Sequence, residues 1–411
     1  MHEKQKYLYV GVDLHKQHHV AVIINCWQEK LGEIKFENKP SVFSTFLLDI
    51  EKLMKDGLTP VFGLEDVGGY GRALAKYLAD HGQVVKEVNP ALSYAERKSY
   101  MTTQKSDSWD AECVARILLN KLDRLPDAKP HDLFWSIQQL VSRRNALVKV
   151  QGALKNQLHI QLSHHYPSYK KFFSEVDGKT ALPFWERYPS PSGLEGVGLK
   201  QLTTFLLKVS NNTCSVKKVN EVLHHVKEDG HTLKEHQDAR DFLVRSIVRD
   251  ISFKKQEMSY VERELKELMR LLDFQLDSMP GIDLVTASAL IAEIGDVRRF
   301  PNANKLARFA GIAPVYFGSG GKGKEQKSKQ GNRALHALFY NLAVQQVQVA
   351  KGSKLPRNPV FHAYYQKKLK EGKTKGQALV CIMRRLVNIV YGMMKHKTAY
   401  KLPIMHEKEV V

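Results

Sequence analysis

Four carboxylates at the ends of predicted secondary-structure elements constrain the fold of this chain more than any other sequence feature. Two of them each end a short apolar run rich in β-branched and aromatic residues, which predicts a strand. The other two lie three residues apart at the start of a helical pattern, so they share one helix face. They are Asp13, Glu65, Asp107 and Asp110. Acidic groups brought together repel one another unless a cation lies between them, so the pattern predicts two Mg²⁺ ions about 4 Å apart.

The element order around these acids predicts an α/β region over residues 7 to about 125. Strands are expected at 8–12, 20–24, 34–37, 60–65 and 84–88, and helices at 43–54, 68–79 and 111–119. The acids fall on the first strand, a later strand and the terminal helix, which matches an RNase H-like arrangement. A doubly wound nucleotide-binding fold would need a glycine-rich turn after the first strand, and Gly11 alone does not supply one.

The charge of the chain indicates a polyanionic partner. Its 411 residues carry a formal net charge of +20, and nucleic acid is favoured over a membrane because no amphipathic anchor or lipidation signal is visible. The alternative is a ribosome-associated or simply basic soluble protein. No signal peptide or membrane-spanning run is visible, which predicts a cytoplasmic, nucleoid-associated protein. The four scattered cysteines argue against zinc and against a disulfide framework.

The middle of the chain predicts two long helices with apolar positions spaced alternately three and four residues apart. One stripe runs from Ile137 to Leu158 and the other from Val244 to Leu272. This spacing favours coiled-coil pairing, either with each other as an antiparallel hairpin or between subunits, although internal helix packing explains it about as well. The expected regions are 1–130, a coiled-coil and helical region 131–275 with an insert at 167–230, a mainly helical region 276–400, and a tail 401–411.

The C-terminal third contains a second chemical motif. Pro280-Gly281 and the apolar helix expected after it resemble half of a helix-hairpin-helix, which is weak evidence by itself. Further on, Ser319 lies among glycines and is followed by basic residues: Lys322, Lys324, Lys327, Lys329 and Arg333. The segment is either a flexible phosphate-binding loop or the site of a serine nucleophile. It lacks the Walker pattern, which argues against ATP.

Taken in order, these motifs resemble the DEDD transposases of the IS110 insertion-sequence group, the bridge-RNA-guided recombinases. The resemblance rests on the four acids and on four later segments: Glu293–Phe300, Ala310–Pro314, Ser319–Lys322 and Ser328–Arg333. It covers nearly the whole chain. One departure is Gly318, where relatives often have a second serine.

The resemblance implies a RuvC-like N-terminal domain, a coiled-coil middle and a C-terminal transposase domain. It further implies that Asp13, Glu65, Asp107 and Asp110 bind Mg²⁺ (or Mn²⁺) and that Ser319 is the nucleophile. The partners it implies are DNA, a structured guide RNA and further copies of the chain. An active site would then combine the N-terminal domain of one subunit with the serine of another.

Several alternatives stay open at this point. The same acids could serve a hydrolytic nuclease of the Holliday-junction resolvase type, with water as nucleophile, or the chain could bind nucleic acid without catalysis. Asp66 and Asp123 are nearby acids that could replace a member of the quartet, although Asp66 would point to the opposite face of its strand. Arg143 and Arg144 are predicted to contact phosphate or to pair with the neighbouring helix. The histidines at 15, 18 and 19 are interpreted as turn residues rather than metal ligands.

Overall fold

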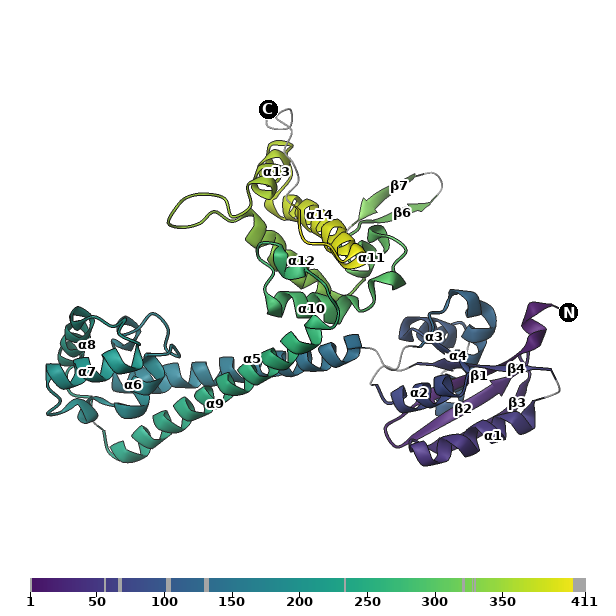
Figure 1. Ribbon diagram of the computed structural model, residues 1–411, viewed down its shortest axis with the longest axis horizontal. Helices are drawn as coiled ribbons and strands as arrows, with labels where there is room; N and C mark the ends of the chain where they lie inside the picture. The colour runs from purple at the N-terminus through teal and green to yellow at the C-terminus, as the bar shows by residue number, and fades with distance from the viewer. Residues whose placement is uncertain are drawn as a thin grey trace. The chain divides into compact units, whose positions relative to one another are not determined.

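The chain folds into two compact units, Met1–Asp132 and Leu133–Val411. The computed structural model describes residues 2–54, 57–65, 69–100, 105–128, 133–232, 234–319, 322–326, 328 and 330–401 (Figure 1). The predicted regions 131–275 and 276–400 both lie in the second unit. Within the part of the chain that the structure describes, every helix is too short or too polar to cross a bilayer. All four cysteines are free thiols.

A mixed five-stranded sheet forms the centre of the first unit. Its strands are β1 (Tyr7–Leu14), β2 (His18–Ile24), β3 (Lys30–Glu37), β4 (Thr59–Leu64) and β5 (Val84–Glu87). Their order across the sheet is β3-β2-β1-β4-β5. β1 pairs antiparallel with β2 and parallel with β4, and β4 pairs parallel with β5. The predicted strands are confirmed, and the topology is consistent with an RNase H-like arrangement.

Helices cover both faces of this sheet: α1 (Phe43–Leu53), α2 (Arg72–Asp80), α3 (Pro90–Lys98) and α4 (Asp107–Lys121). Successive residues of a strand face opposite sides. Accordingly, Leu8 and Val10 of β1 pack in a core with α1 and α2, whereas Tyr9 packs in a second core with α4. α3 contacts α4 on this second side. The sequence analysis predicted the other three helices but not α3, a short helix with little apolar periodicity whose first residue is Pro90.

Gly11 allows β1 and α4 to approach each other closely. A Cβ atom at this position would lie 2.1 Å from the carbonyl oxygen of Ala111 and 2.3 Å from the backbone nitrogen of Ala115. Both are backbone atoms of a buried helix, so neither can rotate away. The same helix carries Asp107 and Asp110, so this contact also sets how close the two acids lie to β1.

We therefore expect Gly11→Ala to lower the free energy of unfolding of the first unit by about 3 kcal/mol or more. Urea unfolding followed by circular dichroism measures the change. Gly152→Ala is the matched control, because Gly152 lies mid-helix with no atom within 4 Å of the added Cβ. That substitution should be neutral or stabilise by up to about 1 kcal/mol. Equal stability of Gly11→Ala and the unmodified protein would contradict the close contact.

Two long helices run side by side in the second unit, α5 (Leu133–His165) and α9 (Gln237–Arg270). They form an antiparallel hairpin within the chain, which is one of the pairings that the apolar stripes predicted (Figure 1). Between them lie α6 (Ala181–Arg187), α7 (Leu199–Val209) and α8 (Val216–Asp229), within the predicted insert. A core rich in aromatic side chains, including Tyr166, Phe172 and Trp185, joins these short helices to the ends of the two long helices.

The rest of the second unit is mainly helical. Its helices are α10 (Leu284–Ile294), α11 (Ala303–Phe309), α12 (Arg333–Val347), α13 (Pro359–Lys370) and α14 (Lys375–His396). α10 follows the predicted glycine turn, but the element before that turn is a single turn of 3-10 helix, Leu276–Ser278. The Asp283 carboxylate already accepts a hydrogen bond from the Thr286 backbone N–H at 2.8 Å, so that amide is not free to bind a phosphate.

A two-stranded antiparallel ribbon interrupts the helices, β6 (Val315–Ser319) and β7 (Lys322–Gln326). The sequence analysis expected a flexible loop here because of the glycines and lysines. The backbone instead pairs in regular register up to Ser319 and Lys322. Glycine content alone therefore misled the local prediction, since two glycines placed opposite each other are compatible with a ribbon.

Candidate active site

Asp13 and Glu65 lie at the same edge of the sheet. β1 and β4 are parallel neighbours with Val12 opposite Leu64, so the residues that follow these two occupy equivalent positions. Asp13 belongs to the last turnward part of β1, and Glu65 comes directly after β4. Both are partly buried. The prediction that these two acids end neighbouring strands is consistent with this register.

The first turn of α4 supplies the other two acids. Ser106 caps the helix, its hydroxyl accepting a hydrogen bond from the Trp109 backbone N–H at 3.1 Å. The hydroxyl of Ser108 donates to Glu33 of β3 at 2.6 Å and accepts from Lys30 at 3.1 Å. These bonds fix the first turn of α4 beside the sheet. Asp107 is about half exposed there, whereas Asp110 is buried.

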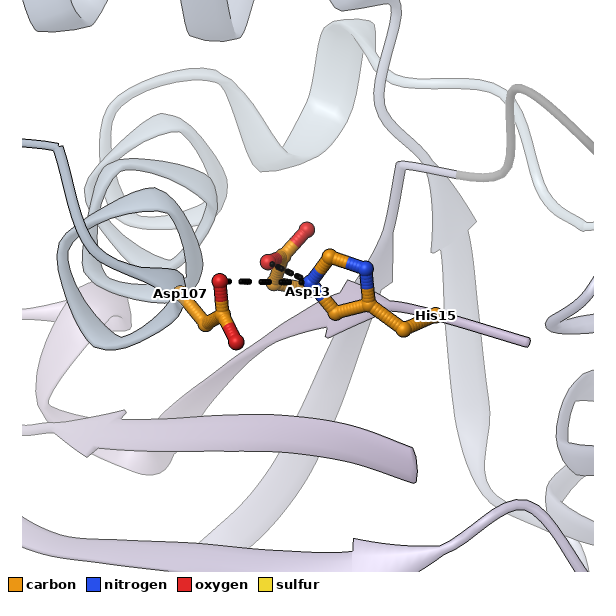
Figure 2. Close-up of side chains that lie close together, drawn as sticks. All are labelled: Asp13, His15 and Asp107. Carbon is orange, nitrogen blue, oxygen red and sulfur yellow. Dashed lines mark hydrogen bonds and ion pairs between the residues drawn. The ribbon is translucent and has the colours of Figure 1, made fainter. Parts of the chain in front are cut away.

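His15 joins Asp13 and Asp107 in one cluster (Figure 2). Its Nε2 atom lies 2.9 Å from Asp13 Oδ2 and 3.3 Å from Asp107 Oδ1. One ligand atom from each of the three residues lies within 4.8 Å of the others. His18 approaches the same group, with Nε2 3.5 Å from Asp107 Oδ2. The interpretation of these two histidines as turn residues outside any site was therefore wrong for their position, since both contact the acids.

The electrostatics of the cluster favour a cation. Burial raises the pKa of Asp13, the nearby His15 lowers it, and the carboxylates of Asp110 and Asp107 raise it further. The net upward shift means that a negative charge on Asp13 is costly without a neighbouring positive one. In the arrangement described here, the His15 imidazole lies between two of the acids and can donate to either.

Asp110 is compensated by a different group. Its Oδ1 lies 2.9 Å from Nη1 of Arg97, on α3. The Asp110 side chain is 9% exposed and that of Arg97 is 26% exposed, so the pair is largely shielded from water. Glu65 also interacts electrostatically with Arg97. The guanidinium therefore supplies part of the positive charge that the sequence analysis assigned wholly to metal ions.

Removing Arg97 should leave the Asp110 carboxylate buried without a partner. We expect Arg97→Ala to lower the free energy of unfolding by about 3 kcal/mol, because an uncompensated buried charge is strongly unfavourable. Urea unfolding is the measurement. The double variant Arg97→Ala/Asp110→Asn should recover part of the loss, and Lys98→Ala, at an exposed neighbouring position, should change stability little. An Arg97→Ala protein as stable as Lys98→Ala would contradict the ion pair.

The donor set fits a divalent ion at one position better than at another. Asp13 and Asp107 bring carboxylate oxygens together, and the imidazole nitrogen of His15 adds a ligand that suits Mn²⁺ as well as the carboxylates suit Mg²⁺. Asp110 would need to exchange or share its bond to Arg97. The other acids considered do not replace these. Asp66 lies outside the described residues, and Asp123 lines a surface pocket beside Tyr7, near the opposite end of β1.

The predicted nucleophile and phosphate-binding residues belong to the second unit. Ser319 ends β6, Lys322 and Lys324 are exposed residues of β7, and Arg333 begins α12. Lys327 and Lys329 lie outside the described residues. On α5, Arg143 is exposed. Its neighbour Arg144 forms an ion pair with Glu262 of α9 at 2.7 Å, the second of the two roles predicted for it.

Three residues near the acids were missed by sequence reasoning. His15 and His18 looked like residues of a polar turn, and Arg97 lies on a helix that was not predicted. A signal for the histidines was present, because His15 follows Asp13 by two residues in the same segment. For Arg97 no spacing rule was available, since its contact with Asp110 depends on the packing of α3 against α4.

Comparison with known proteins places both units in one group. Residues 10–167 match a family model for the DEDD domain of IS110 transposases, which is described as a transposase. Residues 274–366 match the model described as "Transposase IS116/IS110/IS902 family". The matched segments include the acids of the first unit and the ribbon of the second.

Known relatives align with the chain over nearly their whole length. An uncharacterized 44.8 kDa protein of insertion element IS116 from Streptomyces clavuligerus is 26% identical over 398 residues, 96% of each chain. A pilin gene-inverting protein of Moraxella lacunata is 24% identical, covering 95% of this chain and 97% of its own. The transposase of insertion sequence IS1111A from Coxiella burnetii is 22% identical over 74% of this chain and 70% of its own.

The fold, the gathered acids and these matches define a transposase, a DNA phosphoryl-transfer enzyme. The chain belongs to the IS110 family of DEDD transposases, which is carried by bacterial insertion sequences.

Proposed function

We propose that this transposase cleaves and rejoins DNA through a covalent phosphoserine at Ser319, assisted by divalent ions bound to the four acids. The observation that supports the proposal most is the convergence of Asp13, His15 and Asp107 at one edge of the sheet. Bound there, Mg²⁺ or Mn²⁺ would stabilise the negative charge that develops on the phosphoryl oxygens and the leaving oxygen. A RuvC-like domain and a C-terminal transposase domain carrying Ser319 are part of the same proposal.

The protein residues have separate tasks in this scheme. The hydroxyl oxygen of Ser319 forms a bond to phosphorus while the bond to one deoxyribose oxygen breaks, leaving a phosphoserine and a free hydroxyl. The bond energy stays in the serine ester, so the free hydroxyl of another strand can attack it and restore a phosphodiester without ATP. Lys322 and Lys324 are exposed on the strand paired with that of Ser319, and we assign them to the DNA phosphates.

Trapping the covalent adduct tests the proposal. The protein is incubated with Mn²⁺ or Mg²⁺ and radiolabelled DNA that contains the end of the element, then denatured and separated by electrophoresis. A labelled protein band that depends on both the metal and Ser319 is the expected result. Cleaved DNA without any adduct would instead support the second candidate, a resolvase-type nuclease that uses the same acids with water as nucleophile.

The partners of the reaction are part of the proposal. The net charge of +20 fits a large nucleic-acid surface, and the resemblance implies a structured guide RNA that pairs with donor and target DNA. It also implies a homo-oligomer whose active site combines the acids of one subunit with the serine of another. Sequencing RNA that copurifies with the protein tests the guide. Mixing Asp13→Asn and Ser319→Ala subunits tests the shared site, since mixed oligomers should recover part of the activity.

A further inference from the structure

The ribbon of β6 and β7 has two chemically different faces. In its register Tyr316 pairs with Glu325, Gly318 with Gly323, and Ser319 with Lys322. Because alternate residues of a strand face opposite sides, Tyr316 shares its face with both glycines. Positions 319, 322 and 324 belong to the other face. One face therefore offers an aromatic ring above bare backbone, and the other carries lysines.

The Tyr316 ring lies directly over the paired glycines. A Cβ atom added to Gly318 would lie 2.6 Å from Cε1 of this ring, and one added to Gly323 would lie 2.3 Å from its hydroxyl oxygen. Real Cβ atoms do not approach other atoms so closely, so both glycines are needed for the ring to occupy this place. Any other residue at position 318, serine included, would displace it.

The ring is also open to solvent. Tyr316 is 65% exposed although one of its sides rests on the glycine backbone. An exposed aromatic side chain normally samples several rotamers, which makes ordering it on a ligand costly. Here the backbone supports one side, so an incoming flat group would meet a ring already in place.

The base of the ribbon is held against the helical core. The backbone N–H of Asn332 donates to the carbonyl oxygen of Phe309 at 2.7 Å, which ties the segment after β7 to the end of α11. The side-chain amide of Asn332 also donates to Glu293 of α10 at 2.6 Å. The ribbon therefore projects from a fixed base.

We propose that Tyr316 is a stacking platform for one unpaired base of the DNA strand that the transposase cleaves. A nucleotide has a flat aromatic base and an anionic phosphate, and the two faces of the ribbon offer a partner for each. Sequence-tolerant stacking on aromatic residues beside a basic surface is the usual way of holding single-stranded nucleic acid. That the stacked base lies beside the scissile phosphate rests on the proposed role of Ser319, whereas the stacking itself does not.

A fluorescence experiment with the full-length protein tests the platform. The probe is a single-stranded DNA 20-mer with 2-aminopurine at a central position, and a second 20-mer has the same sequence as RNA. All variants carry Ser319→Ala so that binding is measured without cleavage. Stacking on Tyr316 should quench the 2-aminopurine fluorescence, and Tyr316→Phe should keep both quenching and affinity because the ring is retained.

Two variants remove the platform in different ways. Tyr316→Leu still covers the glycines but cannot stack, and Gly318→Ala keeps the tyrosine but displaces its ring. Both should weaken DNA binding by about tenfold and abolish the quenching. Tyr340→Ala, which removes an exposed tyrosine of α12, is the matched control and should bind as the parent does. Circular dichroism melting of each variant monitors folding.

Specific outcomes overturn the proposal. Unchanged quenching in Tyr316→Leu would show that the ring only shields the glycines. A loss seen with the RNA probe but not with DNA would reject a DNA base as the occupant. Failure of the proposed function is distinguishable, because it would appear as a missing Ser319 adduct in the otherwise unmodified protein while the 2-aminopurine quenching persists.

Discussion

Strand cleavage by the Ser319→Ala variant is expected to fall by at least about a thousandfold, with complete loss of the protein–DNA adduct. The hydroxyl is the atom that would bond to phosphorus, and alanine offers no substitute. DNA binding should be nearly unchanged, because the lysines of β7 and the acids of the first unit remain. Gel electrophoresis of end-labelled DNA, under native and denaturing conditions, measures cleavage and adduct together.

The control for this variant is Ser353→Ala, an exposed serine of the same unit. It should cleave and form adduct as the unmodified protein does. Normal cleavage by Ser319→Ala would remove the covalent scheme. Cleavage lost with the adduct still present would mean that a different residue forms the bond to DNA.

The Asp13→Asn variant should lose both metal affinity and turnover, each by roughly a hundredfold. The substitution removes one negative charge with little change in shape, at the residue whose oxygen lies closest to His15. Because burial and the neighbouring carboxylates already make the charge on Asp13 costly, its asparagine variant should fold at least as stably as the unmodified protein. Mn²⁺ binding by electron paramagnetic resonance gives a readout that is independent of activity.

Members of the quartet should differ in a way that identifies their roles. Asp107→Asn should resemble Asp13→Asn, since both oxygens face His15. Asp110→Asn should in addition destabilise the fold, because it leaves Arg97 without its partner. Asp123→Asn, remote from the cluster, is the control and should bind Mn²⁺ normally. Unaltered Mn²⁺ affinity in Asp13→Asn would refute the assignment of Asp13 as a ligand.

The α/β part of the fold was predictable because its signals are local. Alternating apolar residues, the turn between β1 and β2, and the acids at strand ends each arise from a few neighbouring residues, and the five strands were confirmed. The two long helices were predictable for the same reason, since their apolar stripes repeat over many turns. The ribbon of β6 and β7 was not, because glycine-rich segments are compatible with both a loop and a strand pair.

The site shows where local reasoning ends. Asp107 and Asp110 share a helix face by spacing, yet one faces His15 and His18 while the other is bound to Arg97. Two residues one turn apart thus have different partners because β1 and α3 pack against different sides of the same helix turn. No periodicity in the sequence encodes such a difference.

By itself the sequence determined the chemical groups available to this transposase, the elements that carry them and the family to which it is similar. Only the tertiary structure decided which groups meet: a histidine between two carboxylates, an arginine on the third, and a tyrosine resting on paired glycines. The physical reason is range. Secondary structure follows from interactions between near neighbours, whereas the charge balance of a site depends on contacts between residues far apart in the chain.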